Sequence, residues 1–218
     1  MEQNNFEELA HQLACPNGEQ GLALGEKMNV LNGFITERSI KALEPVKGEH
    51  ILEIGFGNGA LSMPIIETIG SDGHFIGVEK SSVLAQQAIT RFALEGLTHV
   101  TVLEGDCHLV SIENNTLNAV LAVNVIYFID DLSKLLQKIH GWLKPGGRVV
   151  IGIRTPETLQ KMAFTKFGFK MRSLDEIKNT MHDAGFINVA SDYFDEGVTQ
   201  FGDLALPIDT LIISSNKK

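Results

Sequence analysis

The sequence predicts an α/β fold built on a mostly parallel sheet with helices on both faces. Three observations lead to this prediction. After residue 50, short apolar runs alternate with amphipathic helical segments, the runs are nearly continuous rather than alternating, and the last two follow each other without a helix. Continuous apolar strands separated by helices are typical of a parallel sheet that is buried on both sides. Two strands without a crossover helix are normally antiparallel neighbours, so the C-terminal edge is expected to be antiparallel.

The expected strands can be placed in order along the chain. Five precede the C-terminal pair, at 50–55, 74–79, 100–105, 119–124 and 148–153. The final two are expected at 188–194 and 207–215.

The segments between these strands have the spacing of amphipathic helices. Residues 82–96 carry Leu84, Ala88 and Phe92 four positions apart. Residues 131–147 carry apolar side chains at helical spacing and end in Pro-Gly-Gly. In the segment 173–186, a serine and a glutamate three residues apart have the spacing of a capping box, and a glycine marks the end.

The first part of the chain is predicted to be helical. Residues 29–48 carry Leu31, Phe34, Ile35 and Leu43 at helical spacing. We expect this part to form a cap over the C-terminal edge of the sheet. No linker separates it from the rest, so residues 1–218 are predicted to form one domain, with 1–48 as the helical cap and 49–218 as the core.

Composition and charge narrow the classes of partner. The chain has 218 residues, 27 acidic against 18 basic, and a formal net charge of −9. Such an acidic chain is not expected to bind nucleic acid. Its apolar runs are far shorter than the roughly 20 residues of a membrane span, and its polar, acidic start is unlike a signal peptide. Cys15 and Cys107 lie far apart and lack metal-ligand spacing, so we expect reduced thiols, no metal and a cytoplasmic location.

The stretch ILEIGFGNGALS, residues 51–62, is the first candidate for a ligand site. Glycine recurs at every second position, as Gly55, Gly57 and Gly59. In an open parallel sheet, ligands bind beyond the carboxyl ends of strands where the strand order reverses, and glycine lets a ligand approach the backbone. The loop could also be only a tight turn. Dinucleotide sites share the strand-loop-helix arrangement, so a nicotinamide-dependent oxidoreductase is an alternative.

Four polar residues in or after the strands indicate which chemical groups the ligand carries. Glu79 ends the second expected strand, where a carboxylate can accept hydrogen bonds from both hydroxyls of a ribose. Asp106 follows the third strand and is placed to meet the exocyclic amine of an adenine. Glu53 lies inside the first strand, and Asn124 closes the fourth beside the same crevice. Each could instead be structural: Glu53 as an acid that satisfies backbone amides, Glu79 as a surface acid and Asp106 as a turn residue.

At these residues the chain resembles the class I S-adenosylmethionine-dependent methyltransferases. The resemblance runs from about residue 48 to the C-terminus and rests on five motifs in order: LEIGFGNG, GVEKS, EGDC, LKPGGRVVI and HDAGFINV. It implies a Rossmann-like, doubly wound sheet of seven strands with the seventh inserted antiparallel. It also implies S-adenosyl-L-methionine as cofactor and methyl transfer as the activity.

The resemblance also implies roles for individual residues. Gly55 and Gly57 would touch the amino-acid end of the cofactor, and Asn124 would lie near its methionine moiety. Glu79 would hold the ribose and Asp106 the adenine amine. The full set of expected cofactor-binding residues is Glu53, Gly55, Phe56, Gly57, Glu79, Lys80, Asp106, Cys107 and Asn124. No catalytic residue is assigned, because methyl transfer depends mainly on placing the acceptor.

The methyl acceptor is expected to be a small molecule. NVIY follows the fourth strand, where methyltransferases of base amines carry an Asn/Asp-Pro-Pro-aromatic motif, and the prolines are missing. The stretch from NVIY to LKPGG is most similar to the branch that methylates small molecules such as quinone precursors and sterols. Two alternatives stay open: a protein-directed methyltransferase, and a non-catalytic module that binds S-adenosylmethionine. The sequence does not indicate the oligomeric state.

The acceptor pocket is expected between the N-terminal cap and the segment 155–172. In that segment, Phe164, Phe167 and Phe169 either line the pocket or seal a helix against the sheet. Tyr127 is the best-placed hydroxyl for meeting an acceptor. In the cap, three residues either fold over the cofactor or belong to an ordinary helical turn: Met28, Asn29 and Asn32.

Overall fold

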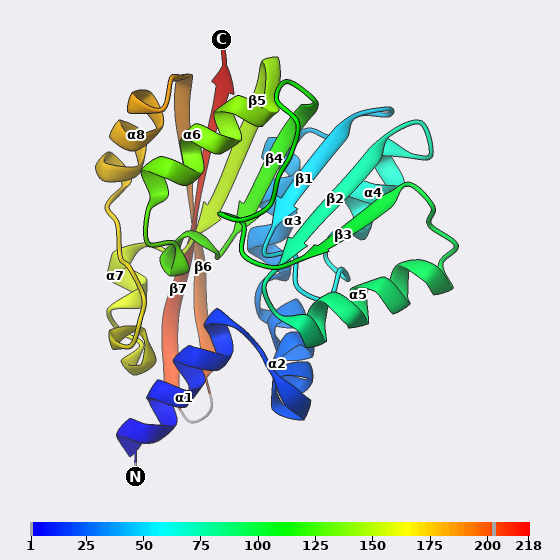
Figure 1. Cartoon of the computed structure of the whole chain (residues 1–218). Helices are drawn as coiled ribbons and strands as arrows, with labels where there is room; N and C mark the ends of the chain where they lie inside the picture. Colours follow the sequence, from blue (N-terminus) through cyan, green and yellow to red (C-terminus); the bar gives the residue numbers. More distant parts are fainter. Residues whose placement is uncertain (1, 202–203) are drawn as a thin grey trace.

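The centre of the protein is a seven-stranded sheet in the order β3-β2-β1-β4-β5-β7-β6 (Figure 1). The computed structural model describes residues 2–201 and 204–218. Strands β1 to β5 pair in parallel, and β7 lies antiparallel between β5 and β6. The strands are β1 (His50–Ile54), β2 (His74–Glu79), β3 (Val100–Glu104), β4 (Leu117–Val123), β5 (Leu143–Ile153), β6 (Phe186–Phe201) and β7 (Leu204–Lys217). The predicted fold class and the antiparallel C-terminal strand are confirmed.

Helices cover the sheet on both faces because the central strands bury both sets of side chains. Leu52 of β1 packs in one core with α6 (Leu132–Trp142) and α8 (Leu174–Asp183). Its neighbour Ile51 packs in the other core with α3 (Gly33–Leu43), α4 (Met63–Ile69) and α5 (Ser82–Leu94). Successive side chains on a strand point to opposite faces, so a continuous apolar run serves two cores.

Side-chain caps define where the helices after the strands begin. The Ser81 hydroxyl accepts a hydrogen bond from the Leu84 amide at the start of α5, and Asp131 does the same for Lys134 at the start of α6. The predicted capping box of Ser173 and Glu176 is present at the start of α8. Each cap satisfies an amide that the first helical turn leaves without a partner.

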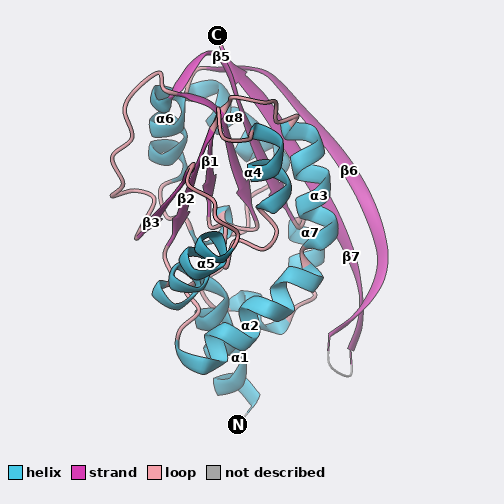
Figure 2. Ribbon diagram, turned by 90° about the vertical axis from the view of Figure 1, so that its right-hand side faces the viewer, coloured by secondary structure: helices cyan, strands magenta, loops and turns pink. Residues whose placement is uncertain are grey.

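The N-terminal region forms three helices where a longer continuous helix was expected. They are α1 (Glu2–Ala14), α2 (Gly18–Leu31) and α3, and the expected helix through residues 31–43 is interrupted at Asn32. Only α1 and α2 lie beyond the carboxyl ends of the strands, whereas α3 runs along one face of the sheet (Figures 1 and 2). Ile35 and Leu43 of α3 are fully buried there, which is why the helix lies against the sheet.

The C-terminal hairpin is longer than the sequence pattern indicates. Only residues 211–216 of β7 pair with β5, and the rest of the strand pairs with β6 alone. The hairpin therefore extends past the sheet as a two-stranded ribbon towards α1 (Figure 1). Residues 195–200 of its outer part are mostly polar and include Gly197, and Pro207 interrupts the apolar run of the partner strand, so the sequence did not indicate its extent.

Three short helices lie beside the sheet's carboxyl edge. They are η1 (Ile126–Phe128), α7 (Pro156–Leu159) and η2 (Ala163–Lys166). Across the described part of the chain, no helix has the length and apolar character needed to cross a membrane.

Candidate functional site

A cavity of about 980 Å³ opens at the carboxyl ends of the strands, where the strand order reverses between β1 and β4. This is the position at which open α/β sheets bind ligands. All nine residues that the sequence analysis proposed for cofactor binding contribute to its wall. Residues that are up to 71 positions apart in the chain, from Glu53 to Asn124, are thus brought to one cavity.

The three alternating glycines serve different purposes. A Cβ on Gly55 would lie 2.3 Å from Cγ2 of Val125, and one on Gly59 would lie 2.5 Å from Cζ of Phe92. These two positions need glycine because the protein's own side chains pack against them. Gly57 has a φ of +65° with open space where its Cβ would be. It is the glycine of the three at which a ligand can approach the backbone without displacing a protein atom.

Glu79 connects the end of β2 to the glycine loop. Its side chain is buried, and its two carboxylate oxygens accept hydrogen bonds from the amides of Gly57 (2.9 Å) and Ser81 (2.8 Å). Burial raises the pKa of this carboxyl, and the backbone hydrogen bonds oppose that rise. A carboxylate oxygen can accept more than one hydrogen bond, so both oxygens can still receive hydroxyl groups from a ligand.

Glu53 lies on β1 below the glycine loop and is buried. Its Oε2 accepts a hydrogen bond of 2.6 Å from the hydroxyl of Ser62, the residue that precedes α4. Burial, with a smaller contribution from the charge of Glu79, raises the pKa of Glu53 to about 7. A carboxyl with such a pKa changes its charge near neutral pH when a cation binds beside it.

The loop after β3 carries Asp106 and Cys107. The amide of His108 donates to Oδ1 of Asp106 at 2.8 Å, and Lys80 Nζ lies 3.9 Å from Oδ2. Lys80 and Asp106 therefore face each other across the cavity wall. Burial raises the pKa of the Cys107 thiol to about 11, so this thiol is neutral at physiological pH. Phe56 contributes to the wall, but its ring packs in the core against Phe75.

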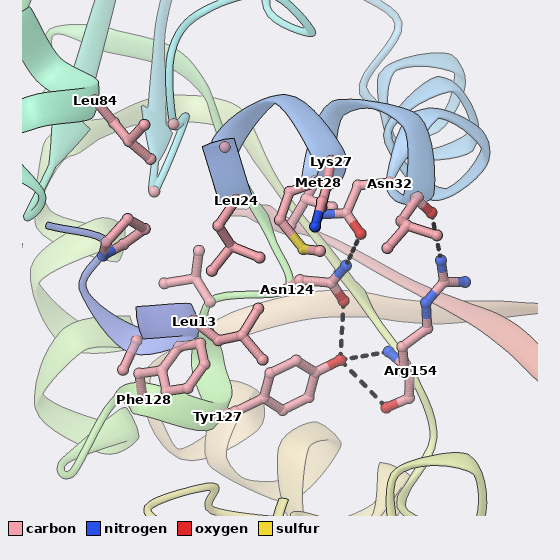
Figure 3. Close-up of a pocket in the computed structure, with 18 of the residues that line it drawn as sticks. Leu13, Leu24, Lys27, Met28, Asn32, Leu84, Asn124, Tyr127, Phe128 and Arg154 are labelled. Atoms are coloured by element: carbon pink, nitrogen blue, oxygen red, sulfur yellow. Dashed lines mark hydrogen bonds between the residues drawn. The ribbon is translucent and has the colours of Figure 1, made fainter. Parts of the chain in front are cut away.

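A chain of hydrogen bonds joins four residues of the cavity wall (Figure 3). The backbone amide of Arg154 donates to the hydroxyl of Tyr127, which donates to Oδ1 of Asn124 at 3.0 Å. Nδ2 of Asn124 in turn donates to Oδ1 of Asn32 at 3.1 Å. Asn124 has a φ of +55°, a left-handed conformation that asparagine tolerates better than most residues. The chain joins the end of β4 to the junction between α2 and α3.

Tyr127 is an anchor for Asn124 and does not offer a free hydroxyl. Its side chain is only 5% exposed, and burial raises its pKa well above its usual range. Because its oxygen already accepts from Arg154 and donates to Asn124, the phenol is unsuited to act as a base. Tyr127 was expected to be the best-placed hydroxyl for meeting an acceptor, but in the structure this hydroxyl is bonded to Arg154 and Asn124.

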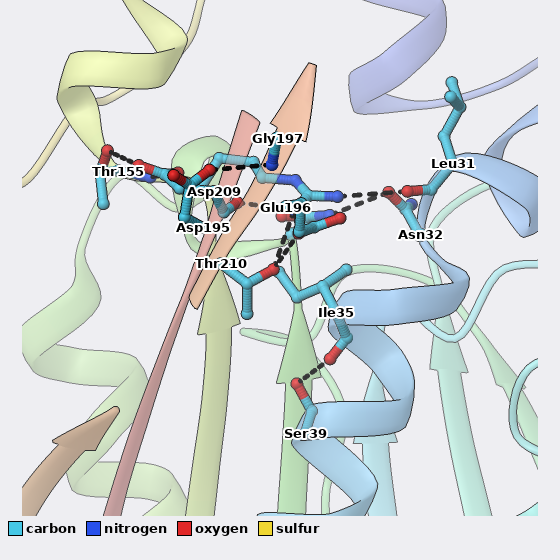
Figure 4. Close-up of polar contacts among 12 residues, drawn as sticks. Leu31, Asn32, Ile35, Ser39, Thr155, Asp195, Glu196, Gly197, Asp209 and Thr210 are labelled. Atoms are coloured by element: carbon cyan, nitrogen blue, oxygen red, sulfur yellow. Dashed lines mark hydrogen bonds and ion pairs between the residues drawn. The ribbon is translucent and has the colours of Figure 1, made fainter. Parts of the chain in front are cut away.

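Arg154 holds the C-terminal hairpin against the helical cap. Its guanidinium pairs with Glu196 and donates to the carbonyls of Asp209 (2.6 Å) and Leu31 (3.2 Å) and to Thr210 Oγ1 (2.8 Å). Figure 4 shows Glu196 and Thr210 on the hairpin facing Leu31 and Asn32. The positive charge is thus matched within the protein, and four segments meet at this side chain.

Helix α2 is fastened across the glycine loop by a shared carboxylate. Oε1 of Glu26 accepts hydrogen bonds of 3.0 Å from both Asn58 and Gln87. Met28 and Asn29 of α2 and the residue that follows this helix at its C-cap, Asn32, line the cavity. These three residues were expected either to fold over a cofactor or to belong to an ordinary helical turn. Their position in the cavity wall agrees with the first of these expectations, although their contact with a cofactor stays a prediction.

The other end of the cavity is built from segments that carry no motif. Of the three phenylalanines in 155–172, Phe164 and Phe169 line the cavity, whereas Phe167 is absent from its lining. The N-terminal cap was expected to border the acceptor pocket, and its helix α1 supplies Phe6, Leu9 and Leu13 to the cavity wall. The contribution of the hairpin, Leu206 and Ile208, was not expected. The helical spacing of the three α1 residues was a usable signal, because positions i, i+3 and i+7 share one helix face.

The groups at the strand ends fit S-adenosylmethionine. The open space at Gly57 leaves room at the backbone, and buried Glu79 supplies oxygens for ribose hydroxyls. Asp106 offers an acceptor for an amine, and Glu53 is an acid that a cationic group can ionise. In the described part of the chain, three residues could together hold a metal ion, Asp106, Cys107 and His108, and they overlap this wall.

Comparison with protein families identifies the core of the chain. Residues 51–147 match the family model described as a methyltransferase domain. Among curated proteins, phosphoethanolamine N-methyltransferase 1 from Triticum aestivum is 28% identical over 174 residues, which cover 77% of this chain and 34% of that protein. The chain spans about a third of the length of that protein and of two other curated relatives that it matches.

Solved structures share the fold at low sequence identity. A chain in the complex of the Haloferax volcanii Trm112 methyltransferase activator with a methyltransferase superposes with a TM-score of 0.76 at 18% identity, covering 89% of this chain and 92% of that one. Phosphoethanolamine N-methyltransferase 2 from Haemonchus contortus, solved with phosphomonomethylethanolamine and S-adenosylhomocysteine, gives 0.67 at 18% identity, covering 84% of this chain and 52% of that one.

Proposed function

The chain belongs to the class I S-adenosylmethionine-dependent methyltransferases, and on that premise we propose that it methylates a small-molecule acceptor. The observation that supports this proposal is one cavity with two different ends. The glycine loop, Glu79 and Asp106 line one end, here called the cofactor end. Apolar side chains from α1 and the segment after β5 line the other end. A donor and an acceptor can therefore lie side by side in one space.

S-adenosylmethionine supplies an electrophilic methyl group on a sulfonium when bound, so the protein's task is mainly to place an acceptor against it. In the proposed arrangement, Glu79 binds the ribose, Asp106 accepts from the adenine amine, and Lys80 lies beside the adenine. Gly55 and Gly57 border the amino-acid end, and Glu53 attracts its ammonium group. Asn124, held by Tyr127, marks the boundary between the two ends.

The proposal needs no general base. Among the described residues that line the cavity there is no histidine, and the carboxylates belong to β1 and to the ends of β2 and β3. Acceptors that react without a base, or that lose their proton to water, suit such a site. The cover provided by α1 and α2 favours a small molecule over a protein side chain as acceptor (Figure 2).

The first test is a calorimetric titration of the purified chain with S-adenosylmethionine, S-adenosylhomocysteine and NADH. We expect the two sulfur ligands to bind with micromolar dissociation constants and NADH not to bind. Binding of NADH alone would support the oxidoreductase alternative and contradict the proposal.

A second measurement separates an enzyme from a binding module. The chain is incubated with S-adenosylmethionine labelled in the methyl group and a metabolite extract, and labelled small molecules are resolved by chromatography. We expect label in a small-molecule fraction. Label in protein only would indicate a protein-directed methyltransferase, and binding with no transfer would indicate a non-catalytic module.

A further inference from the structure

We propose that the acceptor is a bulky, uncharged and mainly apolar molecule, which distinguishes this chain from relatives named for phosphoethanolamine. The inference rests on the proposed function and concerns the end of the cavity away from the glycine loop, here called the apolar compartment. Its walls come from α1, α2, the aromatic residues around η1 and η2, and the hairpin. A cavity of about 980 Å³ is at the upper end of the range for small-molecule sites, so it has room beyond a single ligand.

Helix α1 supplies one wall of this compartment. Phe6, Leu9 and Leu13 occupy positions i, i+3 and i+7 and therefore share one face of the helix. All three line the cavity and stay only partly buried, unlike core residues such as Ile51. The apolar stripe of α1 thus faces an open space that a ligand can fill. Filling it would remove apolar surface from water, which favours an apolar occupant.

Aromatic rings form a second wall. Phe169 stacks on Tyr127 with ring centroids 5.7 Å apart and meets Phe128 edge to face at 4.7 Å. Phe164 lies 5.7 Å from the same ring. Rings held against one another in this way form a rigid apolar surface, which suits a molecule with its own planar or branched hydrocarbon part.

The charged side chains near the compartment do not offer a phosphate site. Of the described cations in the cavity wall, Arg154 is bonded to Glu196 and to three further oxygens. Lys27 and Lys161 are exposed to solvent, where their charge is screened. Lys80 lies 3.9 Å from Asp106 at the other end. Arg154 is the one buried cation among these four, and its charge is already matched, so a phosphate buried in the compartment would lack a matched buried cation, which is costly.

The polar groups at the inner end of the compartment can orient an acceptor through hydrogen bonds. Asn32 and Asn124 meet there through a hydrogen bond of 3.1 Å (Figure 3). Each amide keeps further hydrogen-bonding capacity, so the pair can hold a neutral oxygen or nitrogen of the acceptor at the boundary with the cofactor end. The acceptor is then apolar along its length and polar at the atom that faces the methyl donor.

The test compares two probes that share a naphthalene ring and differ in the presence of a phosphate group, with phosphoethanolamine as a third ligand. The full chain is saturated with S-adenosylhomocysteine and titrated with 2-naphthol, with 2-naphthyl phosphate and with phosphoethanolamine. We expect 2-naphthol to bind at least about tenfold more tightly than its phosphate ester, because the ester would bury an unmatched charge. Phosphoethanolamine is expected not to bind.

A substitution in the α1 wall tests where the probe binds. Leu9→Arg places a cation in the compartment and is expected to shift the preference towards 2-naphthyl phosphate by about tenfold. Leu94→Arg on α5 is the matched control, because Leu94 is 83% exposed and does not line the cavity. Leu13→Arg repeats the test one turn further along the same face if Leu9→Arg does not fold.

The outcomes separate the two proposals. Failure of S-adenosylhomocysteine to bind the unmodified chain would count against the proposed function. Binding of S-adenosylhomocysteine with tighter binding of the phosphate ester or of phosphoethanolamine, or with no binding of 2-naphthol, would overturn the acceptor class and leave the proposed function standing. A preference for 2-naphthol that Leu9→Arg leaves unchanged would also overturn it.

Discussion

The two ends of the cavity are built in different ways. The cofactor end uses loops that directly follow β1, β2 and β3, and its polar groups come from residues inside short motifs. The apolar compartment uses side chains from α1, α2, η2 and β7, which are separated by most of the chain. One end is therefore fixed by local sequence at strand ends, and the other depends on how distant elements pack.

Because the two ends differ in this way, specificity can change in the apolar compartment without loss of the fold. Glu53 and Glu79 are buried and bonded to neighbouring loops, so substitutions there disturb both binding and structure. The apolar compartment is lined by partly exposed side chains on peripheral helices. Substitutions there change the shape and polarity of the wall with less effect on the two cores.

The largest effect is expected from breaking the connection between the hairpin and the cap. Glu196→Ala leaves the Arg154 guanidinium, which is 9% exposed, without its carboxylate partner. We expect a loss of about 3–5 kcal/mol in the free energy of unfolding, measured by urea denaturation. Glu49→Ala is the control, since it breaks the more exposed pair with Arg148. An equal loss in both variants would mean that the Arg154–Glu196 pair contributes no more to stability than the Arg148–Glu49 pair.

At the cofactor end, Glu79→Ala removes an acceptor that the proposal assigns to the ribose. Two charged hydrogen bonds of roughly 1.5–3 kcal/mol each would be lost, so the dissociation constant for S-adenosylhomocysteine should rise by about 100-fold or more. Glu104→Ala on the adjacent strand is the control, because Glu104 is exposed beside Glu79 in the sheet. An unchanged affinity of Glu79→Ala for S-adenosylhomocysteine would contradict the proposal that Glu79 binds the ribose.

The glycine loop offers a comparison between packing and binding. Gly59→Ala would collide with Phe92 and should cost about 2–3 kcal/mol of stability, measured by thermal or urea unfolding. Gly57→Ala meets no atom and should cost only about 1–2 kcal/mol, from its positive φ. Cofactor binding should suffer more in the folded Gly57 variant. Equal stability losses would contradict the different roles given to the two glycines.

Glu53 should make stability depend on pH. Its pKa is raised from 4.5 to about 7 in the folded protein, so folding retains the proton that the unfolded chain loses. The contribution is present below pH 4.5 and is lost as pH rises through about 7, by at most about 3 kcal/mol. Glu53→Gln should flatten urea-derived stability between these values, while Glu67→Gln, exposed on α4, should not. A Glu53→Gln curve that still falls would contradict this origin.

The smallest effect on turnover is expected for Tyr127→Phe. The change leaves the Arg154 amide without its acceptor and should cost about 1–3 kcal/mol of stability. Since the phenol is already bonded on both sides, we expect kcat to fall by less than about tenfold, with an unchanged pH profile. Loss of the rise in kcat with increasing pH would instead identify Tyr127 as a base.

Much of the fold followed from the sequence alone. Strand β2 lies at the predicted residues, and the capping box of α8 was predicted from Ser173 and Glu176. The interruption of the N-terminal helix at Asn32 and the length of the hairpin were not predicted, because each depends on packing between distant elements.

The α/β class, the parallel sheet with its antiparallel strand, and the glycines and acids at the strand ends could be predicted from the sequence. These follow from local patterns, since a strand, its loop and its terminal acid are neighbours in the chain. Three properties became visible only in the folded structure: Gly55 and Gly59 serve packing, Tyr127 anchors Asn124, and α1 faces an open compartment. Those properties arise from contacts between residues far apart in sequence, which no local pattern contains.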